Sequence, residues 1–133
     1  MNIKKLLVSV LLAAIVSRVR FFICSSKQIQ CLSVDEFEHQ LIATKFEQLI
    51  DVCKQKEFGK CHIPGAKNID FRSSDFRREI GKLDKTKPIL LYCLSGVRSK
   101  LTASICKKAG FVSIYELDRG FRAWIEADKP VEN

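Results

Sequence analysis

The sequence of 133 residues lacks the patterns that mark several common classes of protein. Its six cysteines include no Cys-x2-Cys pair, and the two histidines, His39 and His62, complete no zinc-site pattern. No basic run is interleaved with aromatic residues, as it is in many nucleic-acid-binding proteins. No internal repeat or low-complexity tract is present, so residues 29–133 are predicted to form a single domain. We therefore expect no metal site, no cofactor and no nucleic-acid partner.

The first 28 residues differ in composition from the rest of the chain. They contain Lys4 and Lys5, then an apolar run over residues 6–16, and no acidic residue. This order is typical of a secretory signal, and a run of about eleven apolar residues is too short to span a bilayer comfortably. We assign residues 1–28 to a signal peptide or N-terminal leader, and expect an exported protein in the periplasm or associated with the cell envelope. Lipidation at Cys24, an uncleaved anchor that attaches the chain to a membrane, and a buried first strand are the alternatives.

The net charge of +8 is concentrated at this end of the chain. Residues 1–30 hold five basic residues and no acidic one, which leaves 18 basic against 15 acidic residues, a net charge of +3, for the rest. That balance is ordinary for a soluble domain. A mildly basic surface suits small anionic substrates.

Apolar runs alternate with helical patterns along the rest of the sequence. Buried strands are predicted at 48–52, 89–92 and 112–117. Helices are predicted after the Ser33-x-x-Glu36 capping box and over 76–83, 99–109 and 121–127. This alternation indicates an α/β fold of three layers, with a central, mostly parallel sheet and helices on both faces. Ligands bind such sheets at the carboxyl ends of the strands, where Asp51 and the segment that begins at Cys93 would share one edge.

The segment Cys93-Leu-Ser-Gly-Val-Arg98-Ser99 lies between a predicted strand and a predicted helix. Backbone N–H groups of such a loop can point at the sulfur, the helix N-terminus adds partial positive charge, and Arg98 adds a full charge. Each of these favours a thiolate. We therefore predict Cys93 as a nucleophile at the base of a substrate-binding loop. The loop residues are Leu94, Ser95, Gly96, Val97, Arg98 and Ser99.

Four motifs in register resemble those of the rhodanese family of sulfurtransferases. They are Leu49-Ile-Asp-Val-Cys53, Glu57-Phe-Gly-Lys-Cys-His-Ile-Pro-Gly-Ala-Lys-Asn-Ile69, Tyr92-Cys-Leu-Ser-Gly-Val-Arg-Ser99 and Gly120-Phe-Arg-Ala-Trp124. The resemblance runs from Leu49 to Pro130 in family order. It implies a three-layer rhodanese-like fold and a thiosulfate sulfurtransferase type of activity.

The resemblance also implies a reaction in which Cys93 carries a sulfur atom as a persulfide. Thiosulfate or a persulfide would be the small anionic donor, and a thiol or another nucleophile would be the acceptor. Arg98 would hold the donor. Asp51 would fix the strand exit beside the loop, and His62 would be a structural histidine rather than a base. The chain is expected to be a monomer.

Loop length distinguishes sulfur transfer from phosphate chemistry. Cysteine phosphatases, including those built on this fold, have five residues between cysteine and arginine, whereas four separate Cys93 from Arg98. The shorter loop is too tight for a phosphoryl group, and it holds no aspartate that could act as a general acid. Two different functions stay open beside sulfur transfer: a thiol–disulfide redox protein, and a rhodanese-fold module that only binds a partner.

Three residues depart from the family pattern. Leu94 is apolar where some thiosulfate-using members have a charged or polar residue, which favours a persulfide as the donor. Cys53 and Cys61 stand where the family has arginine and glycine, so Glu57 is expected to lose the arginine that pairs with it. The two cysteines suggest a disulfide that closes a short loop. Alternatively they are independent free thiols, or Cys53 is a redox partner of Cys93.

Overall fold

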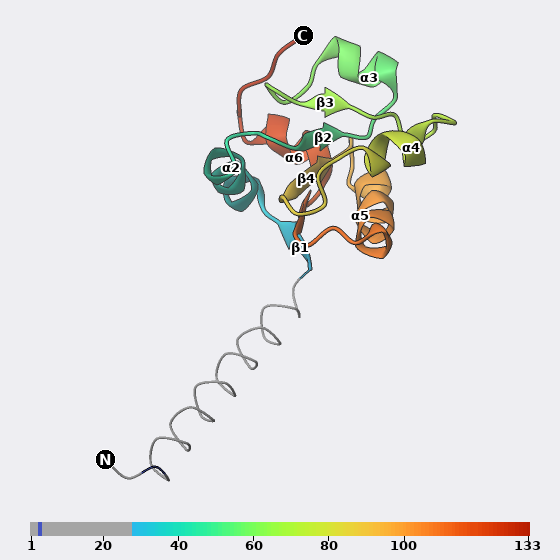
Figure 1. Cartoon of the computed structure of the whole chain (residues 1–133). Helices are drawn as coiled ribbons and strands as arrows, with labels where there is room; N and C mark the ends of the chain where they lie inside the picture. Colours follow the sequence, from blue (N-terminus) through green and yellow to red (C-terminus); the bar gives the residue numbers. More distant parts are fainter. Residues whose placement is uncertain (1–2, 4–27) are drawn as a thin grey trace.

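A five-stranded parallel sheet forms the centre of the molecule in the computed structural model, which describes Ile3 and residues 28–133 (Figure 1). The strand order is β1-β5-β4-β2-β3, and every neighbouring pair is parallel. The strands are β1 (Ile29–Leu32), β2 (Leu49–Asp51), β3 (Lys67–Asn68), β4 (Ile89–Tyr92) and β5 (Ile114–Leu117). The predicted leader and Cys24 fall outside the described residues, apart from Ile3 and Gln28. No helix in the described part is long and apolar enough to cross a bilayer.

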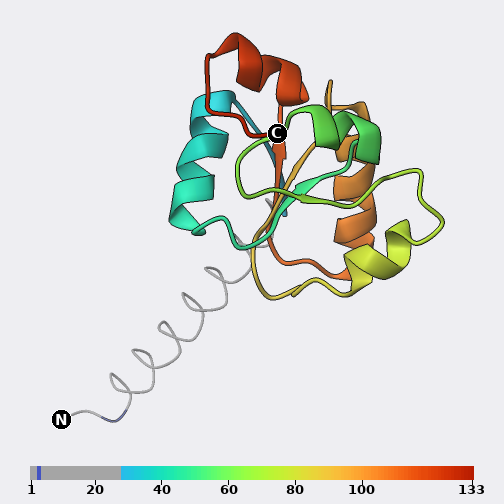
Figure 2. The same ribbon diagram turned by 90° about the horizontal axis from the view of Figure 1, so that it is seen from above.

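Helices cover both faces of the sheet, so the predicted three-layer α/β fold is confirmed. Helices α4 and α5 lie on one side, and α2 and α6 on the other (Figures 1 and 2). A short helix, α3, follows β2. The helices are α2 (Val34–Ala43), α3 (Gln55–Lys60), α4 (Phe76–Gly81), α5 (Val97–Ala109) and α6 (Gly120–Glu126).

The central strand β4 divides the core into two clusters. Leu91 and Cys93 pack beneath α4 and α5 with Phe76 and Ala103, while Leu90 packs on the opposite face. Successive side chains of a strand point to opposite faces, so one wholly apolar strand supplies both cores. All four residues of β4 are buried, which fits a strand covered on both sides.

Three short elements were not predicted from the sequence: β1, β3 and α3. Strand β1 alternates between exposed and half-buried positions at the edge of the sheet, and β3 has only two residues. Helix α3 has only six residues and buries none of them, so its sequence carries no apolar periodicity that would predict a helix. Its first turn is closed instead by Glu57, whose carboxylate accepts the Lys54 N–H at 2.8 Å.

The ends of β2 and β4 lie side by side and position the site. Asp51 is in register with Tyr92, and the Val52 N–H donates to the Tyr92 carbonyl at 2.9 Å. The residues after these two strands, Cys53 and Cys93, therefore leave the sheet at the same edge. The prediction that both strand exits share one edge is confirmed.

Candidate active site

Cys93 lies at the end of β4 with its sulfur enclosed by the loop that follows it. The Gly96 N–H donates to Sγ at 3.1 Å, and the Ser99 Oγ lies 3.6 Å from Sγ. Gly96 has φ of +97°, a left-handed conformation that turns the chain back over the sulfur. Several backbone donors were expected, but in the described part of the chain one backbone N–H meets the sulfur. Cys93 is 0% exposed, so its sulfur is closed off from solvent in this structure.

Some residues of the loop are buried and others are exposed. Ser95 and Val97 are exposed, whereas Gly96 and Ser99 are buried. Leu94 is half-buried and packs against both core clusters. Its apolar side chain thus anchors the loop to both cores.

The start of α6 fixes the backbone of Cys93. The Phe121 N–H donates to the Cys93 carbonyl at 2.8 Å, and the Arg122 N–H donates to the Leu94 carbonyl at 3.1 Å. Gly120 permits this approach, since a Cβ there would lie 2.3 Å from the Cys93 carbonyl oxygen. Gly120 was not among the predicted site residues, although it opens the Gly-Phe-x-x-Trp motif that could have identified it.

Arg98 forms a bidentate ion pair with Glu57. Its Nη1 and Nη2 lie 2.7 and 3.0 Å from the two carboxylate oxygens. The pair lowers the pKa of Glu57 to about 2, chiefly through the hydrogen bond from Arg98, and raises the pKa of Arg98. The expectation that Glu57 loses its partner is wrong: Arg98 takes the place of the family arginine that Cys53 replaces. The guanidinium that was predicted to hold the donor is therefore already paired.

Cys53 lies beside this ion pair as a buried free thiol. Its Sγ is 3.9 Å from Nη2 of Arg98, and its N–H donates to Oδ1 of Asp51 at 2.8 Å. Burial raises the pKa of the Cys53 thiol, and the neighbouring Asp51 raises it further. Cys53 is therefore a neutral thiol at physiological pH.

The predicted Cys53–Cys61 disulfide is absent, because both cysteines are free thiols. Cys53 belongs to the core cluster beneath α4 and α5, whereas Cys61 packs against the cluster beneath α2 and α6. The two side chains thus join different cores. The alternative of two independent thiols describes this structure.

Asp51 lies at the end of β2, where its Oδ1 accepts the Cys53 N–H, and it is 2% exposed. Burial raises its pKa, while hydrogen bonds from Cys53 and Tyr92 oppose that rise. The Tyr92 hydroxyl also accepts the Ile63 N–H at 3.0 Å, and burial raises the pKa of Tyr92. Asp51 and Tyr92 together connect two strand exits to the segment that precedes β3.

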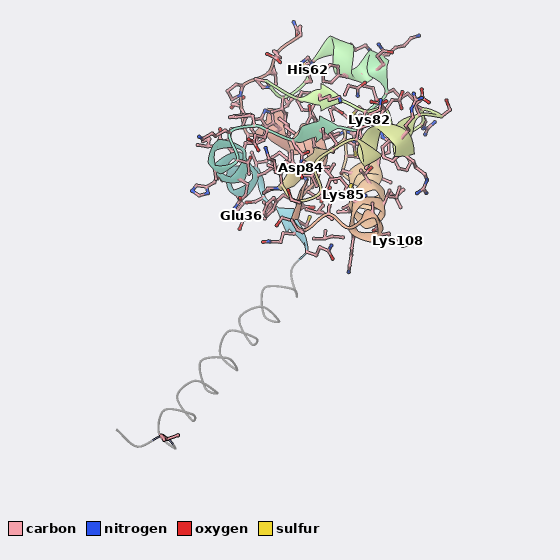
Figure 3. The ribbon with its side chains drawn as sticks, in the orientation of Figure 1. Glu36, His62, Lys82, Asp84, Lys85 and Lys108 are labelled. Carbon is pink, nitrogen blue, oxygen red and sulfur yellow. The ribbon has the colours of Figure 1, made fainter. Side chains whose placement is uncertain are left out.

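His62 packs against α3 and the C-terminal segment. Its ring stacks on Phe58 at 3.8 Å between centroids, and Nδ1 lies 2.9 Å from the Phe58 carbonyl. Nε2 lies 3.1 Å from Oε1 of Glu132, which joins the C-terminal segment to α3. Figure 3 shows His62 beside α3. Both ring nitrogens are thus engaged.

Glu116 is a buried carboxylate behind the loop, and it was not among the residues predicted for the site. Its Oε1 accepts the Ser99 hydroxyl at 2.6 Å, and its Oε2 accepts the Cys31 thiol at 3.0 Å. Glu116 is 1% exposed. An acidic residue in a short apolar strand is the signal that could have marked it. No cluster of three or more His, Cys, Asp or Glu side chains in the described residues is arranged to hold a metal ion.

Comparison with known proteins agrees with this architecture. The family described as Rhodanese-like domain matches residues 33–127. The sequence is 33% identical to thiosulfate sulfurtransferase GlpE of Shewanella oneidensis over 97 residues, which cover 73% of this chain and 93% of that protein. It is 32% identical to the uncharacterized protein YqhL of Bacillus subtilis over 112 residues, 84% of this chain and 85% of that one.

The fold itself is found in a solved structure. A rhodanese-related protein from Thermoplasma volcanium has a TM-score of 0.66 at 22% identity, over 77% of this chain and 97% of that one. The chain belongs to the rhodanese-like domain family, which includes sulfurtransferases. The resemblance drawn from the four motifs is confirmed.

Proposed function

We propose that this protein is a sulfurtransferase that carries a sulfane sulfur as a persulfide on Cys93 and passes it to a thiol. The observation that carries the proposal is the placement of the Cys93 sulfur at the end of β4, where the Gly96 N–H donates to it at 3.1 Å. A sulfur held by a backbone donor at the end of a parallel strand is suited to nucleophilic chemistry.

The reaction has two balanced steps. In the first, the Cys93 thiolate attacks the outer sulfur of the donor; the donor's S–S bond breaks, and its remaining thiolate or sulfite departs with the electron pair. In the second, an acceptor thiolate takes the outer sulfur from the Cys93 persulfide, and Cys93 leaves as a thiolate. The acceptor ends as a persulfide.

The ion pair between Arg98 and Glu57 supports a persulfide rather than thiosulfate as the donor. Thiosulfate carries two negative charges, and a guanidinium already bound by a carboxylate offers little charge to a second anion. A persulfide carries at most one negative charge, on its terminal sulfur, and none when that sulfur is protonated. Leu94 adds no polar group to the loop mouth. Thiosulfate would then be a poor substrate.

Other functions of a reactive cysteine have less support. A phosphatase would need its loop arginine for the phosphoryl oxygens, but here that arginine is paired with Glu57. A disulfide with Cys53 gains no support from the surroundings of Cys53, whose sulfur lies 3.9 Å from Nη2 of Arg98 and whose thiol pKa is raised by burial. A module that only binds a partner would have no use for a persulfide on Cys93, and the presence or absence of that persulfide can be measured.

The leader and the cellular location belong to the same proposal. Lys4, Lys5 and the apolar run over residues 6–16 support export through a signal peptide. The intact mass of the mature protein recovered from cells tests this directly. Loss of the first residues supports export with cleavage, an added lipid mass supports attachment at Cys24, and a full-length unmodified chain argues against both.

Mass spectrometry of the Cys93 peptide tests the proposed function. After incubation with a low-molecular-weight persulfide, we expect a gain of about 32 Da, one sulfur atom, on this peptide. Thiosulfate should give the same adduct more slowly. Cys93→Ser should prevent it, and Cys106→Ser, a matched change of a buried cysteine in α5, should not. If a folded protein gave no adduct on Cys93, sulfur transfer would be excluded and a module that only binds a partner would be the function left.

A further inference from the structure

A continuous hydrogen-bonded chain connects the Cys93 sulfur to the buried carboxylate of Glu116. This series of hydrogen bonds passes through the Ser99 hydroxyl, which is 3.6 Å from Sγ of Cys93 and 2.6 Å from Oε1 of Glu116. Ser99 and Glu116 are 0% and 1% exposed. Buried carboxylates are normally paired with a cation, but in the described part of the chain Glu116 forms no ion pair. Its two oxygens accept only from Ser99 and Cys31 there.

The single proton of the Ser99 hydroxyl fixes the direction of this chain. The 2.6 Å distance to Glu116 is typical of a hydroxyl that donates to a carboxylate, and the other acceptor within reach, the Gly96 carbonyl, lies farther away at 3.2 Å. Once its proton points to Glu116, Ser99 can only accept from Cys93. In this arrangement Ser99 accepts from the Cys93 thiol and donates to Glu116.

We propose that Glu116 is a positioning residue and proton acceptor that deprotonates Cys93 through Ser99. In the step, the Cys93 thiol proton moves to the Ser99 oxygen while the Ser99 proton moves to Oε1 of Glu116. The products are a thiolate, a hydroxyl and a carboxylic acid, so protons and charge balance without a co-reactant. The same proton returns when the thiolate leaves in the second half of the reaction. This inference rests on the proposed sulfur transfer by Cys93.

The groups around Glu116 are consistent with this role. From β1, the Cys31 thiol donates to Oε2 at 3.0 Å, and its pKa is raised to about 12 by burial and by the hydrogen bond to Glu116. Cys31 thus stays protonated and leaves Oε1 to Ser99. Asp118, on the chain after β5, also accepts from Cys31 at 3.6 Å and is paired with Lys100 of α5 at 3.6 Å. The other cation next to Ser99, Arg98, is bound to Glu57.

Replacement of Glu116 by glutamine tests whether Glu116 accepts a proton from Cys93 or acts on Cys93 only through its negative charge. A buried carboxylate near a thiol disfavours the thiolate, so its removal alone would make Cys93 more reactive. The relay predicts the opposite, because a carboxamide accepts the Ser99 hydrogen bond but takes no proton. Glu116→Gln preserves the shape of the side chain and the hydrogen bond, and the sign of the change in reactivity decides between the two.

The experiment follows alkylation of Cys93 by iodoacetamide at the level of its peptide, over a range of pH. We expect Glu116→Gln to slow alkylation at neutral pH by roughly 100-fold, the scale of general-base assistance. The wild-type rate should change little near neutrality, because the proton moves within the protein, whereas the variant should gain about tenfold per pH unit. Glu126→Gln on the exposed face of α6 is the matched control and should match the wild type.

Variants of Ser99 give a second test that leaves Glu116 intact. Ser99→Ala should reproduce the pH profile of Glu116→Gln, and Ser99→Thr, which retains the hydroxyl, should restore the flat profile. The Ser99→Ala/Glu116→Gln double variant should be no slower than either single variant, because both break one chain. Equal or faster alkylation in Glu116→Gln would overturn the relay. So would additive losses in the double variant.

The readout keeps the two proposals distinguishable. Alkylation reports the Cys93 thiol without any sulfur donor, and the Cys93 persulfide adduct of the wild type reports sulfur transfer. If the adduct forms but Glu116→Gln alkylates normally, the relay fails and sulfur transfer stands. If no adduct forms in the wild type, sulfur transfer fails whatever the alkylation profile shows.

Discussion

The guanidinium of Arg98 binds both carboxylate oxygens of Glu57, at 2.7 and 3.0 Å. Glu57 is itself held by the Lys54 N–H at the start of α3, so the pair ties the active-site loop to the segment after β2. This contact changes the electrostatics of the loop, because Arg98, in the first turn of α5, is neutralised by Glu57. The choice of sulfur donor, the stability of the protein in acid and the effect of replacing Cys53 all depend on this ion pair.

Acid should weaken the contribution of the Glu57–Arg98 pair to stability. The pKa of Glu57 is lowered in the folded protein to about 2, so the pair stabilises the fold fully above the usual glutamate pKa near 4.5 and loses its effect as the pH falls toward 2. Glu57→Gln should cost about 1 kcal/mol at neutral pH, since the pair is partly exposed. Denaturant unfolding at a series of pH values measures the difference, which should vanish in acid. A difference that stays constant down to pH 2.5 (about two units below the usual value) would contradict this.

Restoration of the family arginine at position 53 should change the choice of donor. Cys53→Arg would place a second guanidinium beside Glu57 and release Arg98 toward the loop. We expect kcat/KM for thiosulfate to rise by about tenfold relative to a persulfide donor, the equivalent of one hydrogen bond to a charged group. Cys53→Ala removes the thiol without adding charge, and its donor ratio should stay at the wild-type value. An unchanged ratio in a folded Cys53→Arg protein would show that the pairing of Arg98 does not limit thiosulfate.

Substitution of Gly120 should damage both stability and the site. Gly120→Ala would bring a Cβ within 2.3 Å of the Cys93 carbonyl oxygen, at a backbone φ of +62°. We expect a loss of about 2–4 kcal/mol in the free energy of unfolding, together with slower persulfide formation, because the backbone of Cys93 must shift. Thermal and denaturant unfolding measure the first effect.

Gly110→Ala provides the matched control. Gly110 also has positive φ, +97°, at the end of α5, but a Cβ there would meet nothing within 4 Å. It should cost only about 1 kcal/mol, from backbone strain, and leave the rate at Cys93 unchanged. Equal losses in the two variants would show that the close approach of α6 to Cys93 is unimportant.

The sequence predicted what depends on local pattern and missed what depends on distant contacts. The apolar run at 89–92 and the Ser33 capping box are local signals, and both appear in the structure as β4 and the start of α2. The partner of Arg98 lies 41 residues away on a helix that has no apolar face. No pattern near Arg98 indicates that pairing.

The cysteines and Glu116 show the same limit. Cys53 and Cys61 are close in sequence, yet their side chains join different cores on either side of α3 in the chain. Glu116 meets Ser99 only because β5 lies beside β4 and beneath α5. The order of strands in the sheet decides such contacts, and the sequence indicated only that the sheet is parallel.

A single-turnover experiment with isotopically labelled sulfur tests the central claim most directly. The protein is loaded from a labelled persulfide, freed of excess donor, and mixed with a thiol acceptor while the label is followed on the Cys93 peptide and on the acceptor. We predict that one label per chain leaves Cys93 at the rate at which it appears on the acceptor, and that Cys93→Ser carries none. Transfer of label at the wild-type rate by Cys93→Ser, or label that stays on Cys93 with acceptor present, would contradict the account.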